Sequence, residues 1–176
     1  MAVRLRTGDL FCVATKGIKA RAIRLVTKWK SRDGRAVYNH AGMVAHPSGV
    51  TFEALGTIRL SHINDYQGNN ILIVRPKVNL KRHPLQRAHK VNAFQKIYEA
   101  HNKQWYPWHR IPMMLLRPLA RRHIPGFPLV CSELTAKYEV LLGTRDWAYA
   151  GITPDDLADI WHVSYCYDVL YEDAWR

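Results

Sequence analysis

The hydrophobic pattern of the chain changes its period near residue 85, and this change constrains the fold more than any other feature. Before it, short apolar runs are bounded by turn residues, as in residues 10–14, 58–60 and 70–75, which predicts strands. After it, apolar residues recur every three or four positions, which predicts a long helix over residues 85–102. Together the two parts predict an α+β domain in which a mostly antiparallel sheet packs against later helices.

A β-hairpin is predicted around His46-Pro47-Ser48-Gly49. Residues 36–45 and 50–55 are rich in small and β-branched types, and Pro and Gly stand where a tight turn prefers them. An even-length loop pairs Gly42 with Glu53 and makes His40 a diagonal neighbour of Glu53 on the same face. An odd-length loop would put His40 and Glu53 on opposite faces.

Two later helices carry end signals in the sequence. Residues 130–142 are followed by Gly143, the residue type that most often closes a helix. Residues 153–156, Thr-Pro-Asp-Asp, combine a capping Thr, Pro at the first position and acids beside the positive helix end. We also expect a short helix within residues 113–122 and a final strand over residues 163–171.

A strongly basic segment over residues 16–35 is inserted between the first two strands. It carries eight Lys or Arg and one acid, which is +7 of the net charge of +12. Apolar residues recur in it at helical spacing and predict a basic amphipathic helix: Ile18, Ala22, Leu25, Val26 and Trp29. Two interpretations stay open, a helix whose basic face is merely solvated above the core, or an anion-binding face. The candidate anion-binding residues are Lys16, Lys19, Arg24 and Lys28.

Composition bounds the class of protein. The 176 residues suit one domain over residues 1–176, and 48% apolar with 23% charged residues excludes wholesale disorder. No stretch approaches the roughly 20 apolar residues of a membrane-spanning helix, and the first residues lack an apolar signal core. We therefore expect a cytoplasmic or virion-associated protein. Three cysteines are too few for a disulfide-stapled scaffold.

The net charge and the motifs indicate which classes of partner molecule this protein could bind. The excess of basic residues predicts attraction to an anionic membrane or cell-wall surface, whereas nucleic acid is disfavoured because only the charge supports it. Nine histidines show no metal-binding spacing, and no Gly-rich phosphate loop is present. We expect no metal and no cofactor. The oligomeric state is left open.

Cys131 is the strongest candidate for chemistry because it begins a predicted helix. Unpaired N–H groups and the helix dipole favour a thiolate there, and the same N–H groups, with Ser132 in support, can receive an oxyanion. A helix-start Cys also occurs as simple packing, His40 as a core histidine and Glu53 as a rim carboxylate. Because a nucleophilic Cys needs a base and the base an orienting partner, the three residues together favour catalysis.

Several short motifs occur in a characteristic order. They are Gly8-Asp9-Leu10-Phe11, Asn39-His40-Ala41-Gly42-Met43-Val44, Phe52-Glu53-Ala54, Cys131-Ser132-Glu133-Leu134 and Ile152-Thr153-Pro154-Asp155-Asp156-Leu157. This order resembles the circularly permuted papain-like cysteine hydrolases of the NlpC type, in the YiiX-like branch related to the lecithin–retinol acyltransferase group. The resemblance implies a permuted papain-like fold with His40 as general base, Glu53 orienting it and Cys131 as nucleophile. It also implies a thioacyl-enzyme formed on a peptide- or acyl-containing substrate, such as a peptidoglycan peptide or a lipid acyl group.

Three functions compete at this point. The leading one is a cysteine hydrolase acting on an amide or ester bond, or an acyltransferase. The second is a non-catalytic structural or binding protein on the same fold, such as a phage virion component. The third is a basic nucleic-acid-binding module, which nothing beyond the charge favours.

Overall fold

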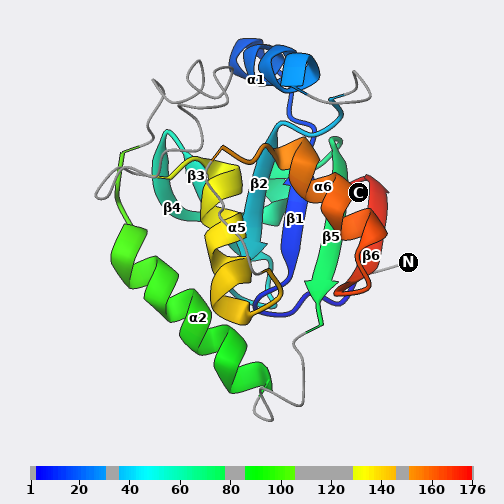
Figure 1. The fold of residues 1–176 in the computed structure, drawn as a ribbon. Coiled ribbons are helices and arrows are strands. Elements are labelled where there is room, and N and C mark those ends of the chain that lie inside the picture. The colour runs from blue at the N-terminus through cyan, green and yellow to red at the C-terminus, as the bar shows by residue number, and fades with distance from the viewer. Residues whose placement is uncertain (1–2, 31–35, 78–85, 106–128, 146–150, 176) are drawn as a thin grey trace.

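A computed structural model describes residues 3–30, 36–77, 86–105, 129–145 and 151–175. Its centre is a six-stranded sheet in the order β4-β3-β2-β1-β5-β6, with every neighbouring pair antiparallel (Figure 1). The strands are β1 (Leu10–Val13), β2 (His40–Val44), β3 (Val50–Leu55), β4 (Thr57–His62), β5 (Asn70–Pro76) and β6 (Tyr167–Ala174). The helices are α1 (Ile18–Lys30), α2 (Gln86–His101), α5 (Cys131–Leu142) and α6 (Pro154–Val163). The predicted α+β class, with an antiparallel sheet against helices, is confirmed.

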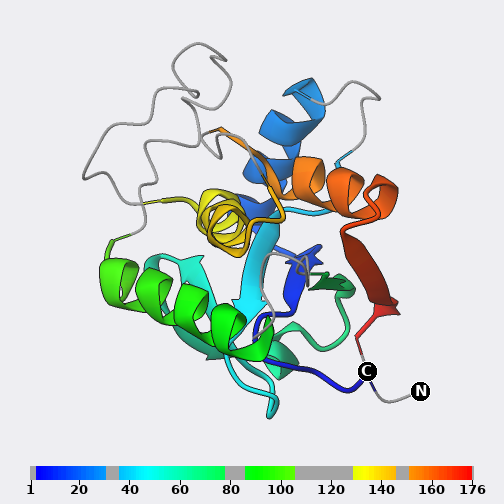
Figure 2. The same cartoon turned by 60° about the horizontal axis from the view of Figure 1, so that its bottom comes forward.

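Helix α5 is the centre of the helical layer. It packs on β2 and β3, with α2 on one side and α6 on the other (Figures 1 and 2). The core beneath it includes Met43, Phe52, Leu134 and Tyr138, each at most 1% exposed. Apolar residues from three elements thus leave water together, which is the main force holding the two layers.

The opposite face of the sheet is covered by shorter pieces of chain. A second apolar cluster there contains Phe11 and Ile73 from the strands, Leu5 from the N-terminal segment and Tyr66 from a short 3₁₀ helix, Ile63–Tyr66. Residues on β1 and β2 alternate between the two faces, because successive side chains of a strand point to opposite sides.

The hairpin register follows the even-length prediction. Gly42 pairs with Glu53, Met43 with Phe52 and Val44 with Thr51. The turn closes with a hydrogen bond of 3.0 Å from the Gly49 N–H to the His46 carbonyl. His40 and Glu53 therefore lie on the same face of the sheet.

The helix end signals also act as predicted. Gly143 has a left-handed φ of 70° at the end of α5, and its N–H reaches the Val140 carbonyl at 3.1 Å. Thr153 caps α6 by accepting from the Asp156 N–H at 3.1 Å, and the Thr153 N–H donates back to the Asp156 carboxylate at 2.9 Å. These reciprocal bonds fix where α6 begins.

Two predicted boundaries differ from the structure. The predicted final strand over residues 163–171 is wrong at both ends, because α6 runs through Val163 and β6 spans Tyr167–Ala174. The bounds of β6 follow its pairing with β5, which joins Tyr167 to Pro76 and Ala174 to Asn70, and this partner is distant in the sequence. The short helix expected within residues 113–122 lies outside the described residues.

Helix α1 differs from the expected helix in extent and in orientation. It starts at Ile18, so Lys16 precedes it. Three of its large apolar side chains face solvent, with Ile18 87%, Leu25 58% and Trp29 77% exposed. The interpretation in which the apolar stripe of this helix packs over the core is therefore wrong, while Arg21 and Lys28 are solvated and the anion-binding role stays a prediction.

Candidate functional site

The hairpin of β2 and β3 brings His40 and Glu53 into direct contact. His40 Nε2–H donates a hydrogen bond to Glu53 Oε2, and the two side chains are 5% and 0% exposed. The diagonal relation follows from the register, since His40 lies two residues before Gly42, the residue opposite Glu53. Sequence reasoning placed this pair correctly.

Glu53 is held by two further donors besides His40. Thr51 Oγ1 donates to Oε1 at 2.6 Å, and the Tyr66 hydroxyl donates to Oε2. Burial alone would raise the pKa of Glu53, but the bonds from His40, then Thr51 and Tyr66, outweigh it and lower the pKa below its usual value. The carboxylate therefore stays ionised in a site that excludes water.

Aromatic rings enclose the His40 imidazole. Phe11 meets it edge-on with ring centroids 6.3 Å apart, and the Tyr66 ring lies at 5.8 Å. Gly42 leaves no spare room beside them. A Cβ at position 42 would lie 2.6 Å from Phe11 Cζ and 3.1 Å from Glu53 Cβ, so only glycine fits without displacing a neighbour.

Cys131 is the first residue of α5 and is 4% exposed. Burial lowers the pKa of His40, but a hydrogen bond and charge from Cys131, and then those from Glu53, outweigh it and raise the pKa from 6.5 to about 10. Because Glu53 occupies Nε2, the ring nitrogen left for the thiol is Nδ1. The three residues form one chain of interactions from thiol to imidazole to carboxylate.

The start of α5 is fastened to the segment before α6. Glu133 accepts from the Val130 N–H at 3.2 Å and from the Gly151 N–H at 2.8 Å. The Ser132 hydroxyl donates to the Ile152 carbonyl at 2.6 Å. The Ser132 hydroxyl thus connects the start of α5 to the segment before α6. The Ser132 backbone N–H lies in the first turn of the helix, where helix geometry leaves N–H groups without a carbonyl partner.

Polar side chains also fix the chain on either side of His40. Asp155 accepts from the N–H groups of Val37 and Tyr38 at 2.9 and 3.1 Å. Asn39 accepts from the Thr15 N–H at 2.9 Å and donates to the Ala20 carbonyl of α1 at 3.4 Å. The approach to His40 is thereby bound to α6 and to α1.

The Gly8-Asp9 motif has an architectural role. Asp9 is 0% exposed, and its carboxylate accepts from Arg75 Nε and Nη2, both at 2.8 Å, and from the Arg6 N–H at 2.8 Å. The Arg75 guanidinium binds this buried carboxylate through two hydrogen bonds. Loss of either partner would leave an uncompensated charge, which is strongly destabilising. It joins the start of β1 to β5.

The other two cysteines differ from Cys131. Cys12 is 0% exposed, its thiol donates to the Pro154 carbonyl at 3.2 Å, and burial followed by the charge of Cys131 raises its pKa. Cys166 is half-buried. All three lie in described residues and are thiols, with no disulfide between them.

Three of the four candidate anion-binding residues have described side chains. Lys16 precedes α1 and is exposed, Lys28 is exposed on the helix, and Arg24 is half-buried one turn before it. The Lys19 side chain lies outside the described part. Of the four, Arg24 and Lys28 are helix neighbours.

Sequence reasoning missed Thr51, Tyr66, Asn39 and Asp155 as supports of the site. Thr51 had a signal, because it lies two residues from Glu53 and so shares its strand face. Asn39 and Asp155 stood in the motifs without an assigned role. Tyr66 had no signal, since a 3₁₀ helix after β4 brings it to Glu53.

The described residues contain no group of three or more His, Cys, Asp or Glu side chains that could hold a metal ion. None of the helices in those same ranges has the length and apolar character needed to traverse a bilayer.

Comparison with known proteins gives a fold neighbour. No protein-family model matches the sequence, and no curated protein sequence matches it either. Among solved structures, the chain is similar to metalloprotein YiiX from Escherichia coli O157:H7, with a TM-score of 0.50 and 16% identity. The match covers 98% of this chain and 99% of the YiiX chain. At this identity the likeness concerns the fold, which is YiiX-like.

Proposed function

We propose that this chain is a cysteine-dependent acyl hydrolase of the permuted papain-like, NlpC type, which cleaves amide or ester bonds through a thioacyl-enzyme. The observation that carries the proposal is the buried His40 imidazole, held by Glu53 on one side and interacting with Cys131 on the other. A raised His40 pKa favours a thiolate–imidazolium pair, which is the reactive state of a cysteine nucleophile.

In the first step, the Cys131 thiolate attacks the carbonyl carbon of the substrate. The carbonyl oxygen takes up the negative charge, and N–H groups in the first turn of α5, including that of Ser132, are placed to stabilise it. Protonated His40 then gives its proton to the departing amine or alkoxide, the bond to that group breaks, and a thioester remains on Cys131.

In the second step, neutral His40 takes a proton from water, and the resulting hydroxide adds to the thioester carbonyl. Collapse of this intermediate expels the Cys131 thiolate and releases a carboxylic acid, so the thiolate–imidazolium pair is restored. Glu53 stabilises the imidazolium in both steps and keeps Nδ1 directed at the thiol. If a hydroxyl or amine of a second substrate replaces water, the same residues perform acyl transfer.

The supporting residues fit this mechanism. Thr51 and Tyr66 keep the Glu53 carboxylate in place, and Asn39 and Asp155 fix the backbone around His40. These hydrogen bonds keep His40 and Glu53 in a fixed relative orientation, and catalysis by a positioned base requires such an orientation.

The test is to incubate the protein with a p-nitrophenyl acyl ester and to locate the acyl group by mass spectrometry. We expect a burst of p-nitrophenolate and an acyl mass on the peptide containing Cys131, with none on Cys12. Cys166, which is partly accessible, is the matched control for an ordinary thiol. The burst should disappear in Cys131→Ala and persist in Cys166→Ser.

The non-catalytic alternative makes a different prediction in the same experiment. If the protein has only a binding or structural role, Cys131 and Cys166 are both acylated slowly. The His40→Ala substitution then changes the acylation rate of neither cysteine. That outcome would overturn the hydrolase proposal.

A further inference from the structure

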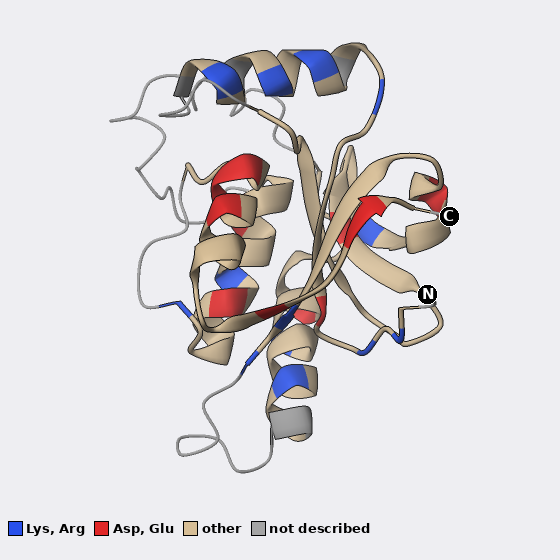
Figure 3. Cartoon of the chain, turned by 90° about the vertical axis from the view of Figure 1, so that its right-hand side faces the viewer, with Lys and Arg blue, Asp and Glu red and all other residues tan. Residues whose placement is uncertain are grey.

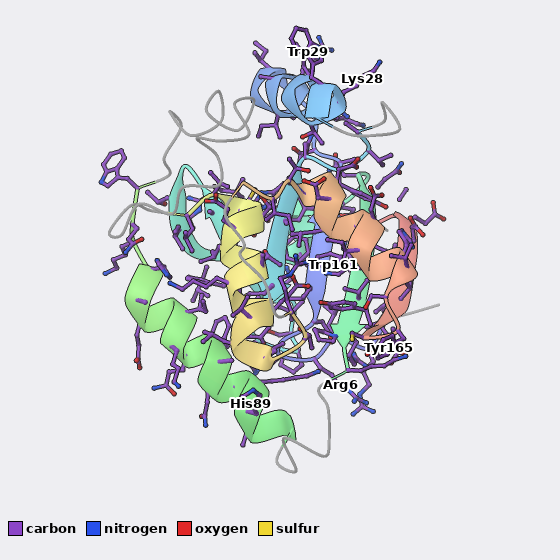
Figure 4. All side chains as sticks on the ribbon, in the orientation of Figure 1. Arg6, Lys28, Trp29, His89, Trp161 and Tyr165 are labelled. Atoms are coloured by element: carbon purple, nitrogen blue, oxygen red, sulfur yellow. The ribbon has the colours of Figure 1, made fainter. Side chains whose placement is uncertain are left out.

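The outward side of α1 is an apolar stripe. Ile18, Ala22, Leu25 and Trp29 are all exposed, and at 3.6 residues per turn they fall within about 60° of the helix circumference. Trp29 projects away from the rest of the molecule in Figure 4. Single exposed apolar residues are ordinary, but an aligned set on one helix marks an interaction surface.

The inward side of α1 explains this orientation. Ala20 and Thr27, on the opposite side of the helix, are only 6% and 2% exposed. The Ala20 carbonyl accepts a hydrogen bond from the buried Asn39 amide. The small side of α1 therefore packs against the body, with Ile23 half-buried beside it, which leaves Ile18, Leu25 and Trp29 on the outside.

The charge of α1 has one sign. Its thirteen residues include five Lys or Arg and no acid (Figure 3). Arg21 and Lys28 are exposed and, by helical geometry, border one edge of the apolar stripe. A helix with exposed apolar residues beside cations is typical of a segment that lies in a membrane interface.

We propose that α1 is an interfacial helix that docks the protein on an anionic phospholipid bilayer. Ile18, Leu25 and Trp29 enter the boundary between headgroups and acyl chains, while Arg21 and Lys28 meet the lipid phosphates. A Trp at the edge of such a stripe suits the interface because its ring has an apolar body and a polar N–H.

Two other occupants fit the surface less well. Nucleic acid would use the cations but gives no role to three exposed apolar side chains in a row. A second copy of the chain would bring two uniformly basic helices together, and like charges at close range oppose association.

The docking surface and the candidate thiol are at the same end of the sheet. In Figure 1, β2 runs away from α1, so its first residue, His40, lies at the end nearer α1. Asn39 joins that end to α1 directly. Docking would therefore turn this end toward the bilayer, although the surface itself does not depend on the thiol chemistry.

The test is flotation with vesicles of phosphatidylcholine, with and without about 30 mol% phosphatidylglycerol. The wild type should float with the anionic vesicles only, and less so as salt rises. Ile18→Ser combined with Leu25→Ser and Trp29→Ser should lower the bound fraction at least tenfold, and Arg21→Gln with Lys28→Gln should lower it roughly tenfold. Quenching of tryptophan emission by acyl-brominated lipid should fall in Trp29→Phe if this ring enters the bilayer.

The control variants remove the same kinds of side chain, apolar or basic, from exposed positions outside α1. Trp105, Val163 and Tyr165 are exposed apolar residues outside α1, and replacing all three by Ser should leave binding unchanged. Lys96→Gln with Lys103→Gln removes the same charge from exposed positions outside α1 and should act like the wild type. Cys131→Ala should also float normally, so loss of the proposed chemistry and loss of docking are told apart.

Three results would overturn the docking proposal. The first is equal flotation of the wild type and the Ser variant of the stripe. The second is a wild-type dimer that this variant converts to monomer, with no vesicle binding by either. The third is tight binding of duplex DNA that depends on Arg21 and Lys28 but not on the stripe, again without vesicle binding.

Discussion

Helices α1 and α5 have opposite relations to the core. In α5, nine of twelve residues are buried, and its polar residues have partners, as Ser132 has in the Ile152 carbonyl. In α1, five cations occur without one acid, and the largest apolar residues are exposed. An unpaired buried charge costs several kcal/mol, so the charged residues that enter the core of α5 need partners there, whereas Arg21 and Lys28 of α1 stay exposed.

The far end of α5 shows how a charge becomes buried. Glu139 is 0% exposed and accepts from Arg145 Nε at 2.7 Å and from Trp161 Nε1 at 2.5 Å. Burial raises the pKa of Glu139 even though Arg145 and Trp161 oppose the shift. Trp161 belongs to α6 and is labelled between the α5 and α6 ribbons in Figure 4, so α6 supplies one of the donors. Helix α1 has no such set of partners in the described residues.

The largest expected effect is on ester turnover, which should depend on Cys131 of α5 and not on the exposed residues of α1. Cys131→Ala should abolish ester turnover, with at least a thousandfold loss, while the fold loses only about 1 kcal/mol because Ala is little smaller than Cys. The stripe and charge variants of α1 should turn over a small soluble ester at the wild-type rate. Steady-state kinetics and urea unfolding measure both quantities. Residual turnover by pure Cys131→Ala would remove Cys131 as the nucleophile.

The same substitution in each helix tests the difference by stability. Leu134→Ala should cost about 2–5 kcal/mol of unfolding free energy, because Leu134 is 0% exposed in the core. Leu25→Ala should change it by less than about 0.5 kcal/mol, because Leu25 is 58% exposed. Similar costs for the two variants would mean that the Leu25 side chain is covered in solution.

Glu53→Gln should slow acylation by about 10- to 1,000-fold, since the imidazolium loses its stabilising charge. Stability should also fall, by about 1–3 kcal/mol, because an amide NH₂ would enter a site already filled by donors from His40, Thr51 and Tyr66. Single-turnover acylation and urea unfolding check these losses. An unchanged acylation rate would show that Glu53 does not orient the base.

The titration of His40 should depend on Cys131. The pKa of His40 is about 10 in the folded protein, whereas its value in the unfolded chain is 6.5. This contribution to stability is therefore fully present below about pH 6.5 and is lost as the pH rises through about 10. NMR of the imidazole ring should show a midpoint lower by more than about one pH unit in Cys131→Ala. An identical midpoint in both proteins would contradict the thiolate–imidazolium pair.

The smallest effect belongs to Tyr66. Tyr66→Phe removes one of three donors to Glu53 and should slow acylation by only a few-fold to about tenfold, with a stability cost of about 1 kcal/mol. Thr51→Val is the matched removal of the donor to the other carboxylate oxygen. A loss as large as that of Glu53→Gln would mean that Tyr66 takes part in the chemistry itself.

Local signals explain what the sequence predicted well. The turn residues 46–49 determined the register that joins His40 to Glu53, and Gly143 and Thr153 marked helix ends through bonds to nearby backbone. Each of these features depends on residues only a few positions apart, so a single sequence contains the information.

Contacts between distant segments explain what the sequence did not predict. Arg75 reaches Asp9 from another strand, and the orientation of α1 depends on Asn39, which follows it in the chain. The spacing of apolar residues in α1 correctly gave a stripe but could not say which way it faces. The side that packs inward carries Ala20 and Thr27, whose small size gives no hydrophobic signal in the sequence.

The close packing at Gly42 limits how this site can diversify. With Phe11 Cζ and Glu53 Cβ already close to the space above it, position 42 can accept no side chain unless a neighbour moves. Engineering aimed at a new specificity should therefore keep glycine at position 42 and vary other positions. On the proposed function, the packing that holds His40 against Glu53 then stays unchanged while the surfaces that meet a substrate vary.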